Sequence, residues 1–131
     1  MIYYFPFLIL IFHYQEKFEC FLFKTKSEIQ KIMNENYKEY KAQGMNIISK
    51  NNTLSYYNTK LDATIMFYFN KEQKCEYIKT IEDIENMPEK INEFNKNYIR
   101  IGPYKWKTTY NQKIIKISIE KEEYNFTVIY Q

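Results

Sequence analysis

The residues of this chain that could do chemistry are few and scattered. His13 is the only histidine, which argues against a His-based catalytic triad or a His-containing metal site. The two aspartates, Asp62 and Asp83, stand at a strand start and a helix entry, where aspartate commonly serves as a turn or cap residue. Gly44 and Gly102 are the only glycines, so a Gly-rich phosphate loop is excluded. The sequence therefore predicts no catalytic residue, no metal site and no cofactor.

The most suggestive cluster alternates aromatic and lysine side chains: Tyr104, Lys105, Trp106 and Lys107. It can be an ordinary strand, with the rings on one face and the lysines on the other. It can also be a surface whose rings stack on bases while its lysines meet phosphates. Because aromatic side chains dominate binding hot spots, these four residues are the predicted interaction surface, and Trp106 is its expected centre.

Cys20 and Cys75 are the only cysteines and are too few and too far apart for a metal site. In an exported protein they could form one disulfide, which would stabilise the fold by about 2–4 kcal/mol. The alternative is two buried free thiols. Pairing requires a geometry that sequence does not reveal, so both interpretations stay open.

The first twelve residues carry no charge, whereas the chain beyond His13 is dense in Lys, Glu, Asn and Tyr. The apolar run has the length of a signal-peptide core, about 7–15 residues, but lacks a basic start and a small-residue cleavage site. It is shorter than the roughly 20 residues that span a bilayer, and Pro6 argues against a central strand. We interpret 1–14 as a signal-like or anchor segment and 15–131 as a single domain. This predicts a protein exported to the periplasm or cell envelope, or tethered to the membrane; the alternative is a core element of a cytoplasmic protein.

Composition favours an ordered domain that is rich in strands. Hydrophobic residues make up 45% and aromatic residues 19% of the 131 residues, and flat rings pack well on a pleated surface. The net charge of +3 is spread along the chain without a basic block. It therefore describes a solvated surface and gives little support for nucleic-acid binding.

Two helices are predicted. Over 24–44, apolar residues recur at steps of three and four, and Thr25 with Glu28, or Ser27 with Gln30, has capping-box spacing. The second helix is expected over 88–97, because Pro88 suits a first turn, with a turn of helix or a loop before it.

Strands are predicted by alternation, separated by short Asn-rich or Lys-Glu turns. Their ranges are 45–50, 53–58, 61–70, 74–79, 105–110, 113–120 and 124–130. The order helix, several strands, helix, three strands resembles two copies of one unit. It indicates an α+β two-layer sandwich, an antiparallel sheet with two helices packed on one face. We expect Ile65, Phe67, Phe69, Ile115 and Ile117 of the sheet to face Ile29, Ile32, Met33, Ile91 and Phe94 of the helices.

Several segments together resemble a known group of proteins. They are the apolar start, Phe18-Glu19-Cys20 before a helix opened by Lys26-Ser27-Glu28-Ile29, the strand 65–70 running into Lys74-Cys75, and Tyr98-Ile99 followed by Trp106. This pattern is similar to that of small exported proteins of unknown function from Bacteroidetes-type bacteria. The resemblance implies export and supplies no functional residues.

These observations predict a non-catalytic module that binds another protein. One alternative is a small enzyme or ligand-binding protein with a Glu/Tyr/Lys site between sheet and helices, which would require a buried Glu with a raised pKa. A second alternative is a weak nucleic-acid binder that uses the lysine-flanked aromatics around Trp106.

Overall fold

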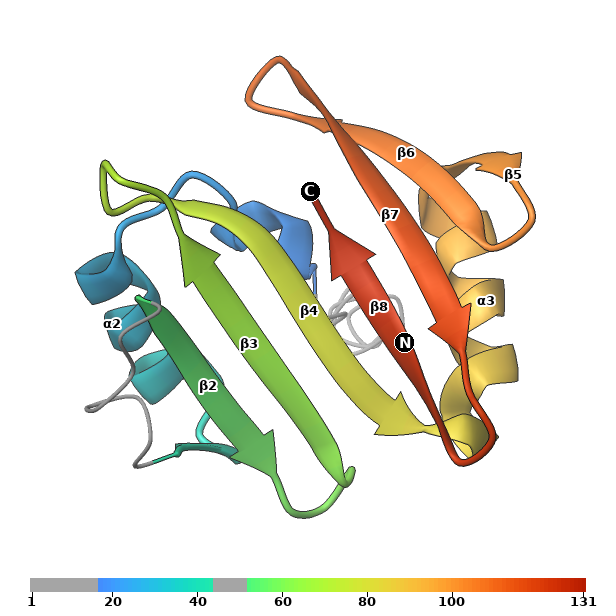
Figure 1. Cartoon of the computed structure of the whole chain (residues 1–131), viewed down its shortest axis with the longest axis horizontal. Coiled ribbons are helices and arrows are strands. Elements are labelled where there is room, and N and C mark those ends of the chain that lie inside the picture. Colours follow the sequence, from blue (N-terminus) through green and yellow to red (C-terminus); the bar gives the residue numbers. More distant parts are fainter. Residues whose placement is uncertain (1–16, 44–51) are drawn as a thin grey trace, which may run out of the picture.

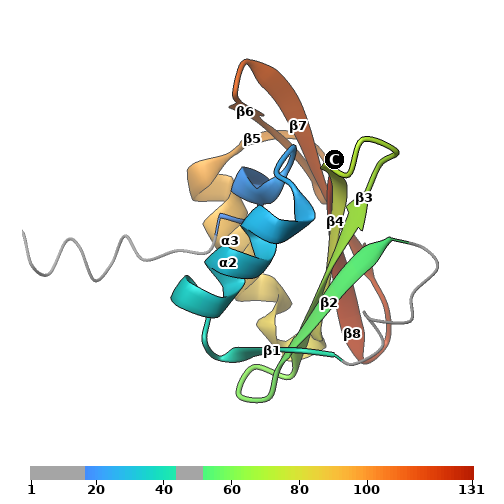
Figure 2. The ribbon, with the colours of Figure 1, turned by 90° about the vertical axis from the view of Figure 1, so that its left-hand side faces the viewer.

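The computed structural model describes residues 17–43 and 52–131, and its centre is one antiparallel sheet of eight strands. Both long helices lie on the same side of this sheet (Figures 1 and 2). In chain order the elements are η1 (Phe18–Phe21), α2 (Lys26–Asn36), β1 (Tyr40–Ala42), β2 (Thr53–Asn58), β3 (Ala63–Phe69), β4 (Cys75–Asp83), η3 (Ile84–Asn86), α3 (Met87–Asn97), β5 (Ile99–Gly102), β6 (Lys105–Tyr110), β7 (Lys113–Lys121) and β8 (Asn125–Tyr130). The predicted α+β class is confirmed, and the sheet is much larger than the arrangement expected from sequence.

The sheet is built from two meanders that meet in its middle. The strand order is β1-β2-β3-β4-β8-β7-β6-β5, so the last strand of each meander pairs with the last strand of the other. Across this seam Ile78 lies opposite Tyr130 and Thr80 opposite Val128. Each meander follows one long helix. The described chain thus contains two helix-plus-four-strand halves in one sheet, and we call these the N-half (α2, β1–β4) and the C-half (α3, β5–β8).

Helix α2 begins where the sequence predicts but ends earlier. Thr25 and Glu28 form the capping box, with the Glu28 N–H donating to Thr25 Oγ1 at 3.3 Å and the Thr25 N–H donating to Glu28 Oε1 at 3.0 Å. The prediction of a helix through residue 44 is wrong, because Asn36 is its last residue. Tyr37 and Tyr40 follow the helical spacing, but Tyr37 is the C-cap of α2 and Tyr40 is the first residue of β1. Their ring centroids lie 6.3 Å apart.

Helix α3 matches the prediction closely. It covers Met87–Asn97 with Pro88 in its first turn, and the 3₁₀ turn η3 precedes it. The strands follow the predicted ranges except for β4, which continues to Asp83 beyond the predicted end at residue 79, and for β1 and β5, which are short and absent from the prediction. The predicted strand 45–50 lies outside the described residues.

The core fills the space between the helices and one sheet face. Ile65, Phe67, Ile115 and Ile117 are buried on the sheet side, and they belong to one cluster with Ile29, Met33 and Phe94 of the helices. Phe69 is buried as well, while Ile32 and Ile91 are partly buried against the same cluster. The predicted pairing of these two faces is therefore confirmed.

Candidate functional site

The residues considered for catalysis have structural roles where the structure describes them. Asp62 lies in the turn between β2 and β3 with a φ of 49° and accepts a hydrogen bond from the Tyr57 hydroxyl at 2.6 Å. Asp83 caps η3 by accepting from the Glu85 N–H at 2.9 Å. His13 and the whole segment 1–14 lie outside the described residues. Both aspartates thus act as turn or cap residues.

The two cysteines are free thiols in the structure. Cys75 is fully buried, and burial raises the pKa of its thiol to about 12. Cys20 is partly exposed, and its pKa is raised by burial and then by the neighbouring Glu19 carboxylate. Because the thiolate is the nucleophile and the metal ligand, neither environment activates a cysteine.

The predicted interaction cluster divides between the core, a turn and the sheet surface. Trp106 is buried, packs edge-to-face on Phe94 at 5.1 Å between ring centroids, and donates from Nε1 to Asn95 Oδ1 at 2.9 Å. Tyr104 lies in the β5–β6 turn and is partly exposed, whereas Lys105 and Lys107 are exposed on β6. Trp106 therefore belongs to the core and is not available to a partner on the surface.

A second group of polar residues lies between α3 and the sheet. The Tyr98 hydroxyl donates to Glu19 Oε1 at 2.8 Å, and both residues are largely buried. Lys90 Nζ lies 3.5 Å from Glu82 and 3.9 Å from Glu93. Burial raises the pKa of Glu93, partly offset by Lys90. The group has the residue types of the predicted Glu/Tyr/Lys site, but each side chain already has a protein partner. Tyr98 joins the end of α3 to η1, and Lys90 joins α3 to β4.

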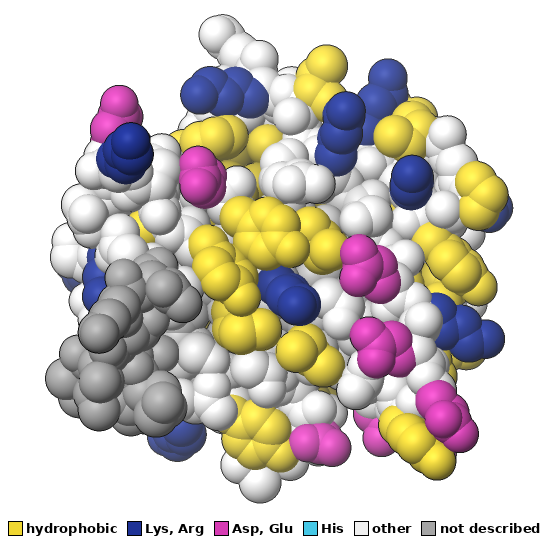
Figure 3. All heavy atoms as spheres, in the orientation of Figure 1, with side chains coloured by type: hydrophobic (Ala, Val, Ile, Leu, Met, Phe, Trp, Pro, Cys, Tyr) yellow, Lys and Arg dark blue, Asp and Glu magenta, His cyan; other side chains and the backbone are white. Residues whose placement is uncertain are grey.

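The sheet face opposite the helices, the open face, is covered by no element that the structure describes (Figure 2). Side chains from three adjacent central strands gather on it, and we call them the aromatic patch: Met66, Tyr68, Tyr77, Lys79, Ile81 and Ile129. In Figure 3 apolar side chains surround one lysine at the centre of this face. All six are half-buried, in contrast to the fully buried residues on the other face.

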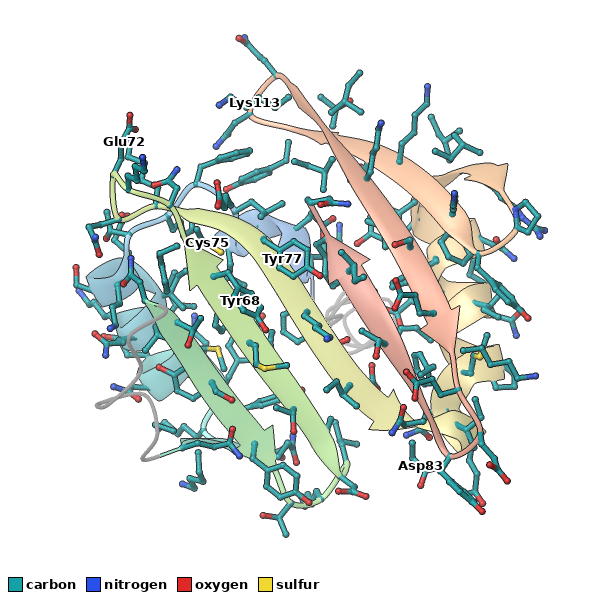
Figure 4. The ribbon with its side chains drawn as sticks, viewed as in Figure 1. Tyr68, Glu72, Cys75, Tyr77, Asp83 and Lys113 are labelled. Atoms are coloured by element: carbon teal, nitrogen blue, oxygen red, sulfur yellow. The ribbon has the colours of Figure 1, made fainter. Side chains whose placement is uncertain are left out.

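The two tyrosines of the aromatic patch pack against each other. Tyr68 and Tyr77 lie opposite each other on β3 and β4, with ring centroids 5.1 Å apart and an interplanar angle of 76° (Figure 4). The Tyr68 hydroxyl also lies 3.5 Å from the Met66 sulfur. The pKa of Tyr77 is raised, mainly because its hydroxyl is partly buried and to a smaller extent because Tyr68 and Glu120 lie nearby. Packing within the sheet therefore fixes the orientation of these two rings.

Lysines flank the aromatic patch on the C-half. Lys105, Lys107 and Lys116 project from the open face of β6 and β7, because their strand neighbours Trp106, Ile115 and Ile117 are buried on the opposite face. We call these three the lysine row. Glu120 is on the same face, and no ion pair within 4.0 Å joins it to the lysine row in the part of the chain that the structure describes. The open face thus combines a half-buried apolar centre with excess positive charge.

Sequence reasoning found only part of this surface. The strand 61–70 has apolar residues on both faces, which is a signal for Met66 and Tyr68. Their neighbours Tyr77 and Ile129 come from strands whose pairing is set by the whole topology. Lys105 and Lys107 belong to the predicted cluster because lysines and rings alternate there. The structure places the two lysines on the open face with Lys116 and buries Trp106 on the opposite face, as the ordinary-strand interpretation expects.

The described residues contain no group of three or more His, Cys, Asp or Glu that could hold a metal ion. Within the same residues, no helix has the length and apolar character needed to cross a bilayer. Comparison of the chain with protein-family models, with curated proteins and with solved structures gives no match.

Proposed function

We propose that this chain is a non-catalytic binding module whose open face docks an acidic surface of another protein. The observation that carries the proposal is the aromatic patch. Its side chains are half-buried although no described element covers them, and the lysine row borders them. Tyrosine offers a large amphipathic contact area and is enriched at protein interfaces. The lysines would accelerate encounter with an acidic partner and orient it.

Charge disfavours a second copy of the chain as the occupant. In a face-to-face pair related by a two-fold axis through the aromatic patch, Lys79 would approach its own counterpart. The lysine row would add three more positive charges from each copy, with Glu120 as the nearby carboxylate on the same face. Like charges held together in an interface cost several kcal/mol. We therefore expect the purified domain to be monomeric.

Ring geometry favours protein over nucleic acid. Bases stack on exposed ring faces, whereas Tyr68 and Tyr77 meet edge-to-face at 76° and are half-buried. Such rings offer edges and hydroxyl groups more readily than flat platforms. Trp106, which the nucleic-acid alternative requires, is only 1% exposed.

The test is site-specific photocrosslinking in the organism that encodes the chain. A photoreactive amino acid replaces Met66 in the aromatic patch, and the same amino acid at exposed Gln30 on α2 serves as the control. We expect a discrete protein adduct from position 66 that is absent from position 30. A nuclease-sensitive adduct, an adduct with a second copy, or identical patterns from both positions would each overturn the proposal.

Charge reversal then tests the stated chemistry of the partner. The double variant Lys107→Glu and Lys116→Glu should lower affinity for the purified adduct partner at least tenfold at low salt. The matched control is Lys31→Glu with Lys96→Glu, which makes the same charge change at exposed helix positions. It should leave binding within about twofold of wild type. Equal losses in the two double variants would show that only net charge matters and would contradict a docking face.

We further propose, from the composition of 1–14 alone, that this segment directs the chain to the membrane or out of the cytoplasm. An uncharged apolar run is costly to leave in water. Fractionation of cells that express the tagged full-length chain should place it in the membrane or envelope fraction. Recovery of the full-length chain only in the cytoplasmic fraction would overturn this part of the proposal.

A further inference from the structure

A groove lies away from the open face, between the start of α3 and the β5–β6 turn. Its volume is about 410 Å³, within the range of about 300–1,000 Å³ that small-molecule sites occupy. Ile84, Met87, Pro88 and Ile91 supply an apolar wall from η3 and α3. We call this hollow the α3 groove.

Three polar side chains complete the lining of the α3 groove. They are Asn92 from α3, Tyr104 from the β5–β6 turn and Lys121 from the end of β7. Among the described residues, no carboxylate lies within 4.0 Å of the Lys121 ammonium, and no acidic side chain lines the groove. A long apolar wall with one unpaired cation at its edge matches a ligand with an apolar body and one anionic head.

Tyr104 is the second residue of the two-residue turn between β5 and β6. Its φ of 57° lies in the left-handed region, where glycine is preferred over a residue with a Cβ. Six other described non-glycine residues share this region, so the value describes the turn and does not by itself mark a ligand site. What the turn does is place an aromatic ring, 39% exposed, against the α3 groove.

We propose that the α3 groove binds a small molecule with an apolar body and a single carboxylate. The apolar body lies along Ile84, Met87 and Ile91 and beneath the Tyr104 ring. The carboxylate pairs with Lys121 Nζ and accepts a hydrogen bond from the Asn92 amide or the Tyr104 hydroxyl. This site is independent of the open face and goes beyond the proposed docking function, so failure of one leaves the other intact.

The test uses decanoate as the probe and decylamine as its charge-inverted counterpart, both followed by two-dimensional NMR of the full chain. We expect saturable one-to-one binding of decanoate, with shifts confined to residues around α3, the β5–β6 turn and Lys121. Decylamine should bind at least tenfold more weakly. Equal affinity for the two probes, decanoate shifts centred elsewhere, or absence of saturable binding would overturn the proposal.

Variants separate the roles of charge and ring. Lys121→Gln should weaken decanoate binding about tenfold, whereas Lys113→Gln at the exposed start of β7 should leave it unchanged. Tyr104→Gly removes the ring and relieves the backbone, so it should weaken binding several-fold while the thermal midpoint stays equal to or above that of wild type. Unchanged binding in Lys121→Gln or in Tyr104→Gly would overturn the assignment, and the retained thermal midpoint ensures that a loss cannot be attributed to unfolding.

Discussion

Beneath α2 the space against the sheet is filled by rings and aliphatic side chains, whereas beneath α3 it also holds ion pairs and directed hydrogen bonds. In the N-half, Phe21 packs on Phe67 at 5.2 Å and on Tyr37 at 5.8 Å between ring centroids. Beneath α3, Lys90 joins this helix to Glu82 on β4 of the N-half, and Asn95 accepts a hydrogen bond from Trp106. The same order of elements thus encloses two different kinds of interior.

The two halves also divide the surfaces. The N-half supplies Tyr68 and Tyr77 of the aromatic patch, and the C-half supplies the lysine row and the α3 groove. Apolar packing is non-directional and tolerates little loss of volume. Polar contacts fix orientation at a modest net gain in stability. Both halves bury large apolar side chains, and the C-half adds directed polar contacts between its helix and the sheet.

The largest effect is expected from removing a ring of the N-half. Phe67 is fully buried between Phe21 and Tyr56, so Phe67→Ala should lower the free energy of unfolding by about 3–5 kcal/mol. Urea-induced unfolding monitored by circular dichroism gives the value. Phe67→Leu, which keeps most of the volume, is the control and should cost clearly less. A loss below about 1 kcal/mol for the alanine variant would contradict the assignment of Phe67 to the core.

The next largest effect is a loss of stability at high pH, which is expected from the buried thiol of the N-half. The pKa of Cys75 rises from 9.0 to about 12 on folding, because burial disfavours the thiolate. Above pH 9 the unfolded chain releases this proton while the folded chain keeps it. Stability is therefore complete below pH 9 and declines between pH 9 and 12, with a limiting slope of about 1.4 kcal/mol per pH unit from this group.

Unfolding in urea from pH 8 to pH 10, under reducing conditions, measures this slope. Cys75→Ala should make the decline between pH 9 and 10 shallower, while the buried tyrosines whose pKa is raised on folding account for the rest of it. Cys20→Ala is the matched control and should change the slope less, since Cys20 is only partly buried. An identical slope in wild type and Cys75→Ala would show that this thiol does not resist ionisation.

A smaller effect is expected from the hydrogen bond between Tyr98 and Glu19 in the C-half. Tyr98→Phe keeps the ring but leaves the buried Glu19 carboxylate without this donor, which should cost about 1–3 kcal/mol at pH 7. The pKa of Tyr98 is raised far above its usual value by burial and by Glu19. The variant should therefore also lose part of the decline in stability above pH 10. Tyr124→Phe at a 76% exposed position is the control, and equal costs in the two variants would contradict a buried hydrogen bond.

Local signals in the sequence were sufficient for the helix starts and most strands. Thr25 with Glu28, and Pro88 in a first turn, act within one turn of helix, so their effect can be predicted without the rest of the fold. The end of α2 was missed because Tyr37 and Tyr40 keep a helical spacing while packing on η1 from a turn and a strand. Helical spacing of apolar residues indicates that they are buried, but it does not indicate whether they lie on a helix, in a turn or on a strand.

The candidate surfaces depend on contacts between distant segments, which is why the sequence did not reveal them. The aromatic patch requires β4 to pair with β8, which brings Ile78 opposite Tyr130 from distant parts of the sequence. The α3 groove requires the β5–β6 turn and the end of β7 to reach α3. Trp106 is the converse case: alternation along β6 assigns it to one face, but Phe94 and Asn95 of α3 determine that this face is the core.

The smallest effect should distinguish the two helix starts. Thr25 accepts from the Glu28 N–H at the start of α2, whereas Asn86 at the start of α3 makes no side-chain capping hydrogen bond. Thr25→Ala should therefore cost about 1 kcal/mol, and Asn86→Ala should stay within about 0.5 kcal/mol of wild type. Urea unfolding of both variants at pH 7 makes the comparison. If the two losses were equal, α3 would depend on its cap as α2 does, and the contrast would be confined to the interior, where Lys90 and Asn95 add polar contacts to the packing of Phe94 on Trp106.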